Sequence, residues 1–245
     1  MSTDTPQHSP FTRPGFIAAA LVIALIVVAG VIVGITRNKP EPEAPPATTA
    51  ATTGESTTAS EPSICGLDGE VLTGTLTTAP ETTWQYQDID AYPTSPKYGP
   101  ADTRDGYRMC YQHTPEGALF SAANAGIQGS MAATDFEAYL AWMNYFVSVD
   151  CPIRDQLLDQ AAAGTDSDPA AQLRIEGFRL LSYNAGDARV DLAFSSMVDG
   201  RTVYMSGVYD LVWENGDWKM SPTDSVNPLR LAQIPDLAGY VDWGE

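Results

Sequence analysis

The residues best suited to chemistry in this 245-residue chain are one histidine near its middle and two aspartates in its C-terminal half. His113 directly precedes a predicted helix cap, and a histidine acts in proton transfer only when a partner group positions it. The sequence identifies no such partner, so fixing the turn is the favoured role. Asp191 and Asp210 lie in predicted strands, where a carboxylate faces either an interior pocket or solvent, and solvent is favoured for Asp210. The three residues are weak pocket candidates.

Known catalytic and metal-binding motifs add no further candidate. The sequence contains no hydrolase nucleophile motif, no glycine-rich phosphate loop and no cysteine–histidine cluster with zinc spacing. The pairs Asp88/Asp90 and Asp166/Asp168 have the two-residue spacing of a calcium loop but lack its further oxygen ligands, so both are interpreted as turns. The sequence therefore predicts no catalytic residue, no cofactor and no metal ion.

The three cysteines, Cys65, Cys110 and Cys151, form no C-x-x-C pair. A disulfide between Cys65 and Cys110 is favoured because both lie in an irregular stretch, and it would suit an oxidising compartment. The alternative is three buried free thiols, since cysteine packs well as a small apolar residue.

The charge of the chain argues against direct contact with nucleic acid. Its net charge is −18, and the part beyond Lys39 carries 10 basic and 30 acidic side chains. Such a field repels phosphate backbones, and the few arginines form no basic stripe.

Residues 16–35 form an uncharged apolar run of 20 residues, which as a helix would measure about 30 Å, the thickness of a bilayer core. Its small residues lie inside the run instead of at a following cleavage site, which favours a retained anchor. Residues 1–15 then form a short cytoplasmic tail, and the Pro/Thr/Ala-rich residues 36–62 form a disordered linker. The basic residues that flank the apolar run, Arg13 before it and Arg37 and Lys39 after it, hardly discriminate between the two orientations of the span in the membrane. The linker, the scarcity of lysine and the possible disulfide favour a single-pass cell-membrane protein with an extracytoplasmic C-terminal domain.

Residues 63–112 are rich in turn-forming residues and predict a loop-rich N-terminal part of the ectodomain. Two short strands are expected in it, at Val71–Thr77 and Tyr107–Gln112. Interleaved aromatic residues indicate that this part packs onto the domain that follows, and the alternative is a binding lip.

Three helices are expected next. Thr114 can cap a helix that begins at Pro115 and ends near Gly126 or Gly129. Thr134 and Glu137 have the spacing of a capping box before a second helix with one apolar face. A third helix is expected at Ile153–Ala163.

From Gln172 onward the apolar residues recur with a period of two, which predicts an antiparallel meander. Its expected strands are Gln172–Tyr183 with a bulge at Gly177, Arg189–Val198, Thr202–Glu214 and Trp218–Met220, and the tail from Pro222 onward should be mostly irregular. The fold class is α+β, with about three helices packed on a curved antiparallel sheet of about four strands.

This order of elements, ending in the hairpin VYDLVWENGDWKM, resembles the cone-shaped nuclear-transport-factor-2-like fold, here over residues 113–245. With the preceding span and linker, the chain is similar to bitopic components of type IV secretion and Gram-positive conjugation systems. The strings CGL at Cys65, YGP at Tyr98–Pro100 and RMCYQHTPEGAL at Arg108–Leu119 resemble anchored proteins of actinobacterial conjugative elements. The resemblance covers residues 16–220, is moderately specific, and implies scaffolding without catalytic residues.

The function expected from these features is that of a non-enzymatic, membrane-anchored scaffold of a conjugation or secretion apparatus, which associates with itself or with other envelope proteins. One alternative is a cone that binds a small ligand or catalyses a reaction, with a deep cavity into which Asp191, Asp210 or His113 points. An interior filled by Trp142, Phe146, Phe194 and Trp213 would argue against that alternative. A second alternative is an envelope protein of unrelated role that shares this architecture.

Overall fold

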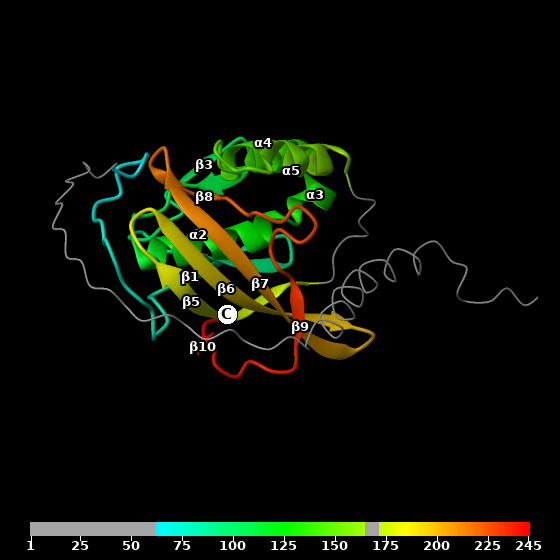
Figure 1. Ribbon diagram of the computed structural model, residues 1–245. Coiled ribbons are helices and arrows are strands. Elements are labelled where there is room, and N and C mark those ends of the chain that lie inside the picture. Colours follow the sequence, from blue (N-terminus) through cyan, green and yellow to red (C-terminus); the bar gives the residue numbers. More distant parts are fainter. Residues whose placement is uncertain (1–61, 165–171) are drawn as a thin grey trace, which may run out of the picture. The chain divides into compact units, whose positions relative to one another are not determined.

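The computed structural model describes residues 62–164 and 172–245 (Figure 1). Contacts divide the chain into two units, Met1–Ser60 and Glu61–Glu245, and all the described residues belong to the second unit. Within the described residues, no helix has both the length and the apolar character needed to cross a membrane. The expected tail, membrane span and linker, up to residue 61, and the Asp166/Asp168 turn lie outside the described residues.

The described part has mixed α+β structure, as predicted. Its main sheet is an antiparallel meander of β5 (Arg174–Tyr183), β6 (Asp187–Val198), β7 (Arg201–Glu214) and β8 (Asp217–Met220). The turn expected at Asn215-Gly216 joins β7 to β8, and both residues adopt the positive φ angles that such a tight hairpin requires.

The C-terminal tail adds two short strands that the sequence analysis did not predict. β10 (Val241–Asp242) pairs with the edge of β5, and β9 (Ala232–Ile234) pairs with β7. These strands are two and three residues long, too short for a recognisable period-two pattern, and the meander's edges supply their hydrogen-bonding partners.

The bulge predicted at Gly177 is present. The register of β5 against β6 shifts between Ile175 and Gly177, and a second shift follows between Leu180 and Ser182. A Cβ atom at Gly177 would lie 2.6 Å from the carbonyl oxygen of Val241, so only glycine lets β10 approach this bend closely.

Among the described residues, four helices precede the meander: α2 (Pro115–Gln128), the one-turn α3 (Met131–Thr134), α4 (Phe136–Phe146) and α5 (Arg154–Ala162). Thr114 caps α2 as predicted, because its side chain accepts a hydrogen bond from the Gly117 N–H. The predicted cap of α4 was wrong. Thr134 ends α3, and Asp135 has the extended φ of a cap residue and accepts from the Ala138 N–H.

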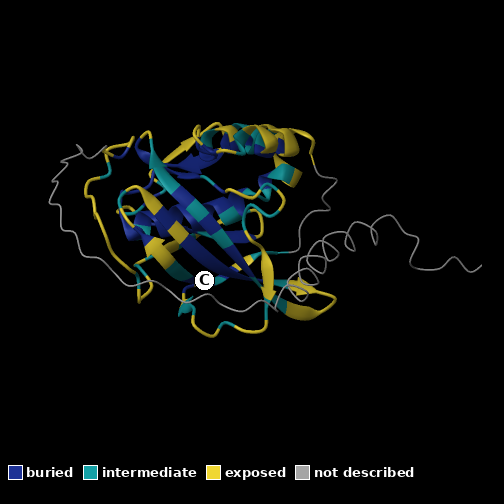
Figure 2. Cartoon of the chain, in the orientation of Figure 1, coloured by how far each residue is buried: buried dark blue, intermediate teal, exposed yellow. Residues whose placement is uncertain are grey.

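The core lies between α2 and the meander, whose long strands pass in front of α2 in Figure 1. Val190, Leu192 and Phe194 of β6 are buried on the face toward α2, where the Phe194 ring closely approaches Gly126. Figure 2 shows that buried residues concentrate in this central region, whereas the far end of the β6–β7 hairpin is exposed.

Residues 63–112 contain two hairpins, β1 (Thr83–Gln87) with β2 (Asp90–Thr94) and β3 (Asp102–Arg104) with β4 (Tyr107–Met109). The predicted strand at Val71–Thr77 was wrong, since only an isolated bridge joins Thr73 to Asn184 there. Val71 and Leu72 are both exposed, so this stretch lacks the buried face that fixes a strand's register.

Candidate functional site

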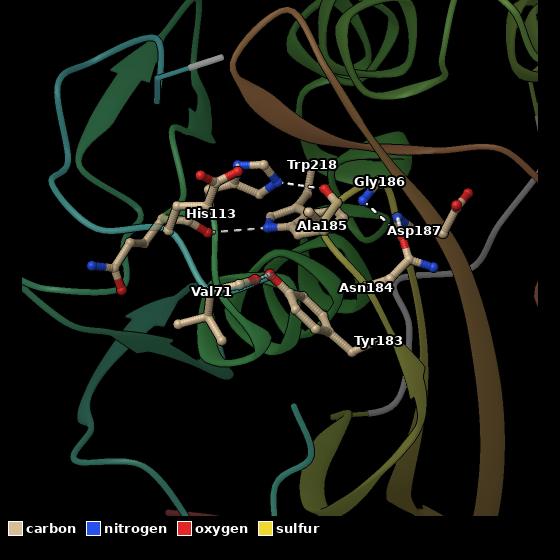
Figure 3. A network of polar contacts seen from close by, with 10 residues as sticks. Val71, His113, Tyr183, Asn184, Ala185, Gly186, Asp187 and Trp218 are labelled. Carbon is tan, nitrogen blue, oxygen red and sulfur yellow. Dashed lines mark hydrogen bonds and ion pairs between the residues drawn. The ribbon is translucent and has the colours of Figure 1, made fainter. Parts of the chain in front are cut away.

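His113 lies in a packed aromatic group between the N-terminal segment and the meander (Figure 3). Its ring is nearly parallel to that of Trp213, with centroids 3.9 Å apart, and its Nε2 contacts the carbonyl oxygen of Ala185 in the β5–β6 turn. Its Nδ1 lies 3.4 Å from a carboxylate oxygen of Glu70. The imidazole is 5% exposed, so it anchors the residues before α2 to the sheet.

Two further hydrogen bonds reinforce this junction, and both are donated by aromatic side chains. The Trp218 indole donates to the carbonyl oxygen of Gln112 at 3.1 Å, and the Tyr183 hydroxyl donates to that of Val71 at 2.8 Å. The surroundings of His113 are therefore those of a structural residue, which agrees with the interpretation favoured from the sequence.

Asp191 is buried on the face of the meander opposite the one that packs on α2. It alternates along β6 with Val190 and Leu192, which face the core. Its carboxylate contacts the Arg179 guanidinium and accepts hydrogen bonds from the Ser206 hydroxyl at 2.6 Å and the Tyr240 hydroxyl at 3.0 Å. The sequence analysis considered that Asp191 could face a pocket inside the domain, and this prediction was wrong. Its carboxylate lies on the outer face and binds the C-terminal tail to the sheet.

Asp210 lies on the same outer face as Asp191 and is only partly exposed. Its two carboxylate oxygens accept separately, one from Arg189 on β6 at 2.6 Å and the other from Arg230 of the tail at 2.7 Å. The structure thus brings none of the three pocket candidates together in one cavity.

Cys65 and Cys110 form a disulfide, the pair that the sequence favoured, with Cα atoms 6.0 Å apart. Cys151 is a buried free cysteine. The disulfide ties the start of the domain to the residues just after β4, where Cys110 adopts a φ of 73°.

Asp217 is a buried carboxylate that the sequence analysis did not single out. It is fully buried and accepts four hydrogen bonds, from the backbone N–H groups of Cys110, Tyr111 and Trp218 and from the Tyr145 hydroxyl at 2.6 Å. Burial raises the pKa of Asp217, whereas the four donors directed at its two oxygens favour the ionised form.

Lys219 is also buried, and its positive charge acts on the Asp217 carboxylate. Its ammonium group lies over the Tyr145 ring, 2.9 Å from the centroid, and its charge opposes the rise in the pKa of Asp217. Burial lowers the pKa of Lys219 to about 8, while Asp217 and Glu214 act in the opposite direction. The pair holds the β7–β8 hairpin against the disulfide-bearing segment.

Arg108 on β4 was also missed by the sequence analysis. Its Nε donates to Asn124 of α2 at 2.7 Å, its Nη1 donates to Gln87 of β1 at 2.7 Å, and the guanidinium carbon lies 3.8 Å from the centroid of the Tyr92 ring. Its Nη2 is buried and has no hydrogen-bond partner. Burial lowers the pKa of Arg108.

A surface cavity of about 380 Å³ adjoins Arg108. Its wall is formed by the two N-terminal hairpins and the loop between them, and its polar side chains include those of Thr83, Gln85, Ser95 and Thr103. Two features of the sequence hinted at this site: an arginine between aromatic and apolar residues in Tyr107-Arg108-Met109, and the aromatic residues of the preceding segment. Neither of them shows that an arginine is buried.

The four aromatic residues whose burial would argue against a ligand-binding interior all pack into the core. Trp142, Phe146 and Phe194 are buried, and Trp213 packs against the same core. Within residues 62–164 and 172–245, no three His, Cys, Asp or Glu side chains cluster in a way that could hold a metal ion.

These features define a disulfide-linked α+β domain with a packed interior and one polar cavity on its N-terminal hairpins. The family model "Domain of unknown function (DUF8175)" matches residues 44–242, which is most of the chain, and the chain belongs to this family. Neither the curated proteins nor the solved structures gave a match.

Proposed function

We propose that this chain is a non-enzymatic, single-pass membrane protein whose C-terminal domain lies outside the cytoplasm and serves as a scaffold of a conjugation or secretion apparatus. The apolar run at residues 16–35 supports the anchor, and the Cys65–Cys110 disulfide supports an oxidising compartment. The helices that cover one face of a bent antiparallel sheet support a nuclear-transport-factor-2-like cone.

The observation that carries the proposal is that the residues suited to chemistry are used in contacts within the domain. His113 anchors the residues before α2, while Asp191 and Asp210 bind the C-terminal tail to the sheet. The interior between α2 and the meander is occupied by aromatic and aliphatic side chains. A cone filled in this way favours a role in which the outer surface makes the functional contacts.

Site-specific photocrosslinking in native membranes tests the scaffold role. A photoreactive residue replaces Met197, which is 57% exposed near the end of the β6–β7 hairpin, or its neighbour Ser196, whose side chain lies on the opposite face of the strand. A scaffold should give discrete adducts, to a second copy or to another envelope protein, that depend on which face carries the probe. Isolated monomers from both positions, and no envelope partner after co-purification, would contradict the proposal.

Protease accessibility tests the orientation separately. The domain should be digested when an impermeant protease is added to intact spheroplasts under reducing and mildly denaturing conditions, while a cytoplasmic control protein stays intact. Digestion only after the membrane is permeabilised would place the domain on the cytoplasmic side.

A further inference from the structure

Arg108 is a buried cation to which the described residues offer no negative charge. The four ion pairs found among them involve His113, Arg179, Arg189 and Arg230, but not Arg108. Its hydrogen-bonding partners, Asn124 and Gln87, are neutral amides. Burying a charge is costly unless it is paired and fully hydrogen-bonded, but Nη2 of Arg108 donates no hydrogen bond to the protein and is shielded from bulk water.

We propose that the cavity beside Arg108 binds a small organic carboxylate that carries hydroxyl groups, of the sugar-acid class, and that the carboxylate supplies the missing countercharge. Guanidinium groups match carboxylates because their N–H donors lie in one plane. The Tyr92 ring covers a flat face of the Arg108 guanidinium, and the Arg108 side chain forms part of the cavity wall, so the ligand approaches Arg108 from the cavity.

The charges around the cavity favour a ligand with a single negative charge. Arg108 is the only basic residue in the cavity wall, and the part of the chain beyond Lys39 carries 30 acidic against 10 basic side chains. A phosphate monoester would bring close to two negative charges to one guanidinium within a repelling field, whereas a carboxylate brings one.

The rest of the wall suits the hydroxyl-bearing part of such a ligand. The hydroxyl groups of Thr83, Ser95 and Thr103 can donate or accept hydrogen bonds, and the Tyr92 ring with two prolines offers apolar surface to C–H groups. The volume of about 380 Å³ is at the lower end of the range for small-molecule sites, about 300 to 1,000 Å³, and fits a monosaccharide. This ligand site is independent of the scaffold role, so either proposal can fail alone.

Saturation-transfer NMR on the full chain in nanodiscs tests the proposal, with D-galacturonate and D-galactose as observed probes and inorganic phosphate as a competitor that displaces them. Galacturonate should bind at least about tenfold more tightly than galactose, because a charge-assisted hydrogen bond is lost with the carboxylate. Equal binding of the two sugars would overturn the role of the charge. Stronger binding of inorganic phosphate would overturn the assignment to an organic carboxylate.

A matched pair of variants localises the binding without disturbing the contacts of Arg108. Thr103 is exposed, lines the cavity and lies directly opposite Arg108 in the β3–β4 ladder. Thr103→Glu should place a competing carboxylate beside the guanidinium and weaken galacturonate binding by about tenfold or more, whereas the nearly isosteric Thr103→Gln should retain it. Unchanged affinity in Thr103→Glu, or equal loss in both variants, would overturn the site.

Arg108→Lys supplies a second readout that a purely structural role would not move. It keeps the positive charge but loses the planar fork, so a variant with native tryptophan fluorescence should lose affinity for galacturonate and keep the weak affinity for galactose. A folded Arg108→Lys protein that binds galacturonate as the natural chain does would overturn the assignment.

Discussion

Asp217→Asn removes one charge from the residue that joins the β7–β8 hairpin to the disulfide-bearing segment. Oδ2 of Asp217 accepts from the Cys110 N–H at 2.8 Å and the Tyr145 hydroxyl, and Oδ1 accepts from the N–H groups of Tyr111 and Trp218. The asparagine amide group must face one of these pairs. The NH₂ group is best placed toward Cys110 and Tyr145, because the Tyr145 hydroxyl can rotate and accept a hydrogen bond from it. The Cys110 N–H then faces another donor and has no acceptor.

The expected loss of stability follows from these contacts. One buried N–H without an acceptor costs about 1–3 kcal/mol, and the remaining bonds weaken because their acceptor is no longer charged. The buried Lys219 also loses the favourable effect of the Asp217 charge on its own protonated form, which adds to the loss. These terms overlap, so we expect a total loss of about 3–5 kcal/mol. Tyr145→Phe, which removes one hydrogen bond to the carboxylate, should cost about 1.5–3 kcal/mol.

Urea denaturation of the full chain in detergent, followed by tryptophan fluorescence, measures both losses. All five tryptophans lie in the unit Glu61–Glu245, so the signal reports on this unit alone. With a slope of about 2–3 kcal/mol per molar urea, Asp217→Asn should lower the midpoint by about 1–2 M. A loss below about 1 kcal/mol, or one no larger than that of Tyr145→Phe, would refute the inference that the ionised carboxylate holds the three backbone donors.

Three further outcomes are expected. Because the pKa of Lys219 is about 8 in the folded state and 10.5 unfolded, the folded state releases this proton at a lower pH. The stability of the natural chain relative to Lys219→Met should therefore rise by about 3 kcal/mol between pH 8 and 10.5, and a stability difference that does not change with pH would contradict this. Cys65→Ser opens a disulfide with a sequence separation of 45 and should lower the free energy of unfolding by about 4 kcal/mol on the chain-entropy model. Cys151→Ser, which breaks no disulfide, should change it little. Gly117→Ala would place Cβ 1.9 Å from the Gln112 carbonyl oxygen and should lower the thermal midpoint by several degrees, whereas Gly186→Ala, with its nearest contact at 3.4 Å, should not.

The meander and α2 could be predicted because their signals are local. A period of two, a turn residue at Asn215-Gly216 and a threonine before a proline each specify structure through contacts a few residues away. The predicted bounds of β7 and α2 lie within a few residues of the observed ones. The predicted strand at Val71–Thr77 failed, and β9 and β10 were missed, because short segments pair only where the fold supplies an edge.

The buried charges could not be predicted for a related reason. Asp191 appeared in the sequence as a possible pocket carboxylate, but Arg179 and Tyr240, which compensate it, lie 12 and 49 residues away and act from β5 and the tail. Asp217 sits beside a hairpin turn, where an exposed aspartate is the usual expectation. Its burial depends on Cys110, more than 100 residues earlier, and no periodicity records that contact.

Arg108 and Asp217 differ in how far the domain satisfies each charge. The Asp217 carboxylate accepts four hydrogen bonds and is affected by the charge of the buried Lys219, so groups of the domain itself compensate its charge. Arg108 has two neutral hydrogen-bonding partners, an aromatic ring over one face and an unpartnered, shielded Nη2, and its side chain lines a cavity. Since an uncompensated buried charge costs stability, a domain that keeps one next to an open cavity gains from it only when an anion is bound. Galacturonate should therefore raise the thermal midpoint of the natural chain and leave that of Thr103→Glu unchanged.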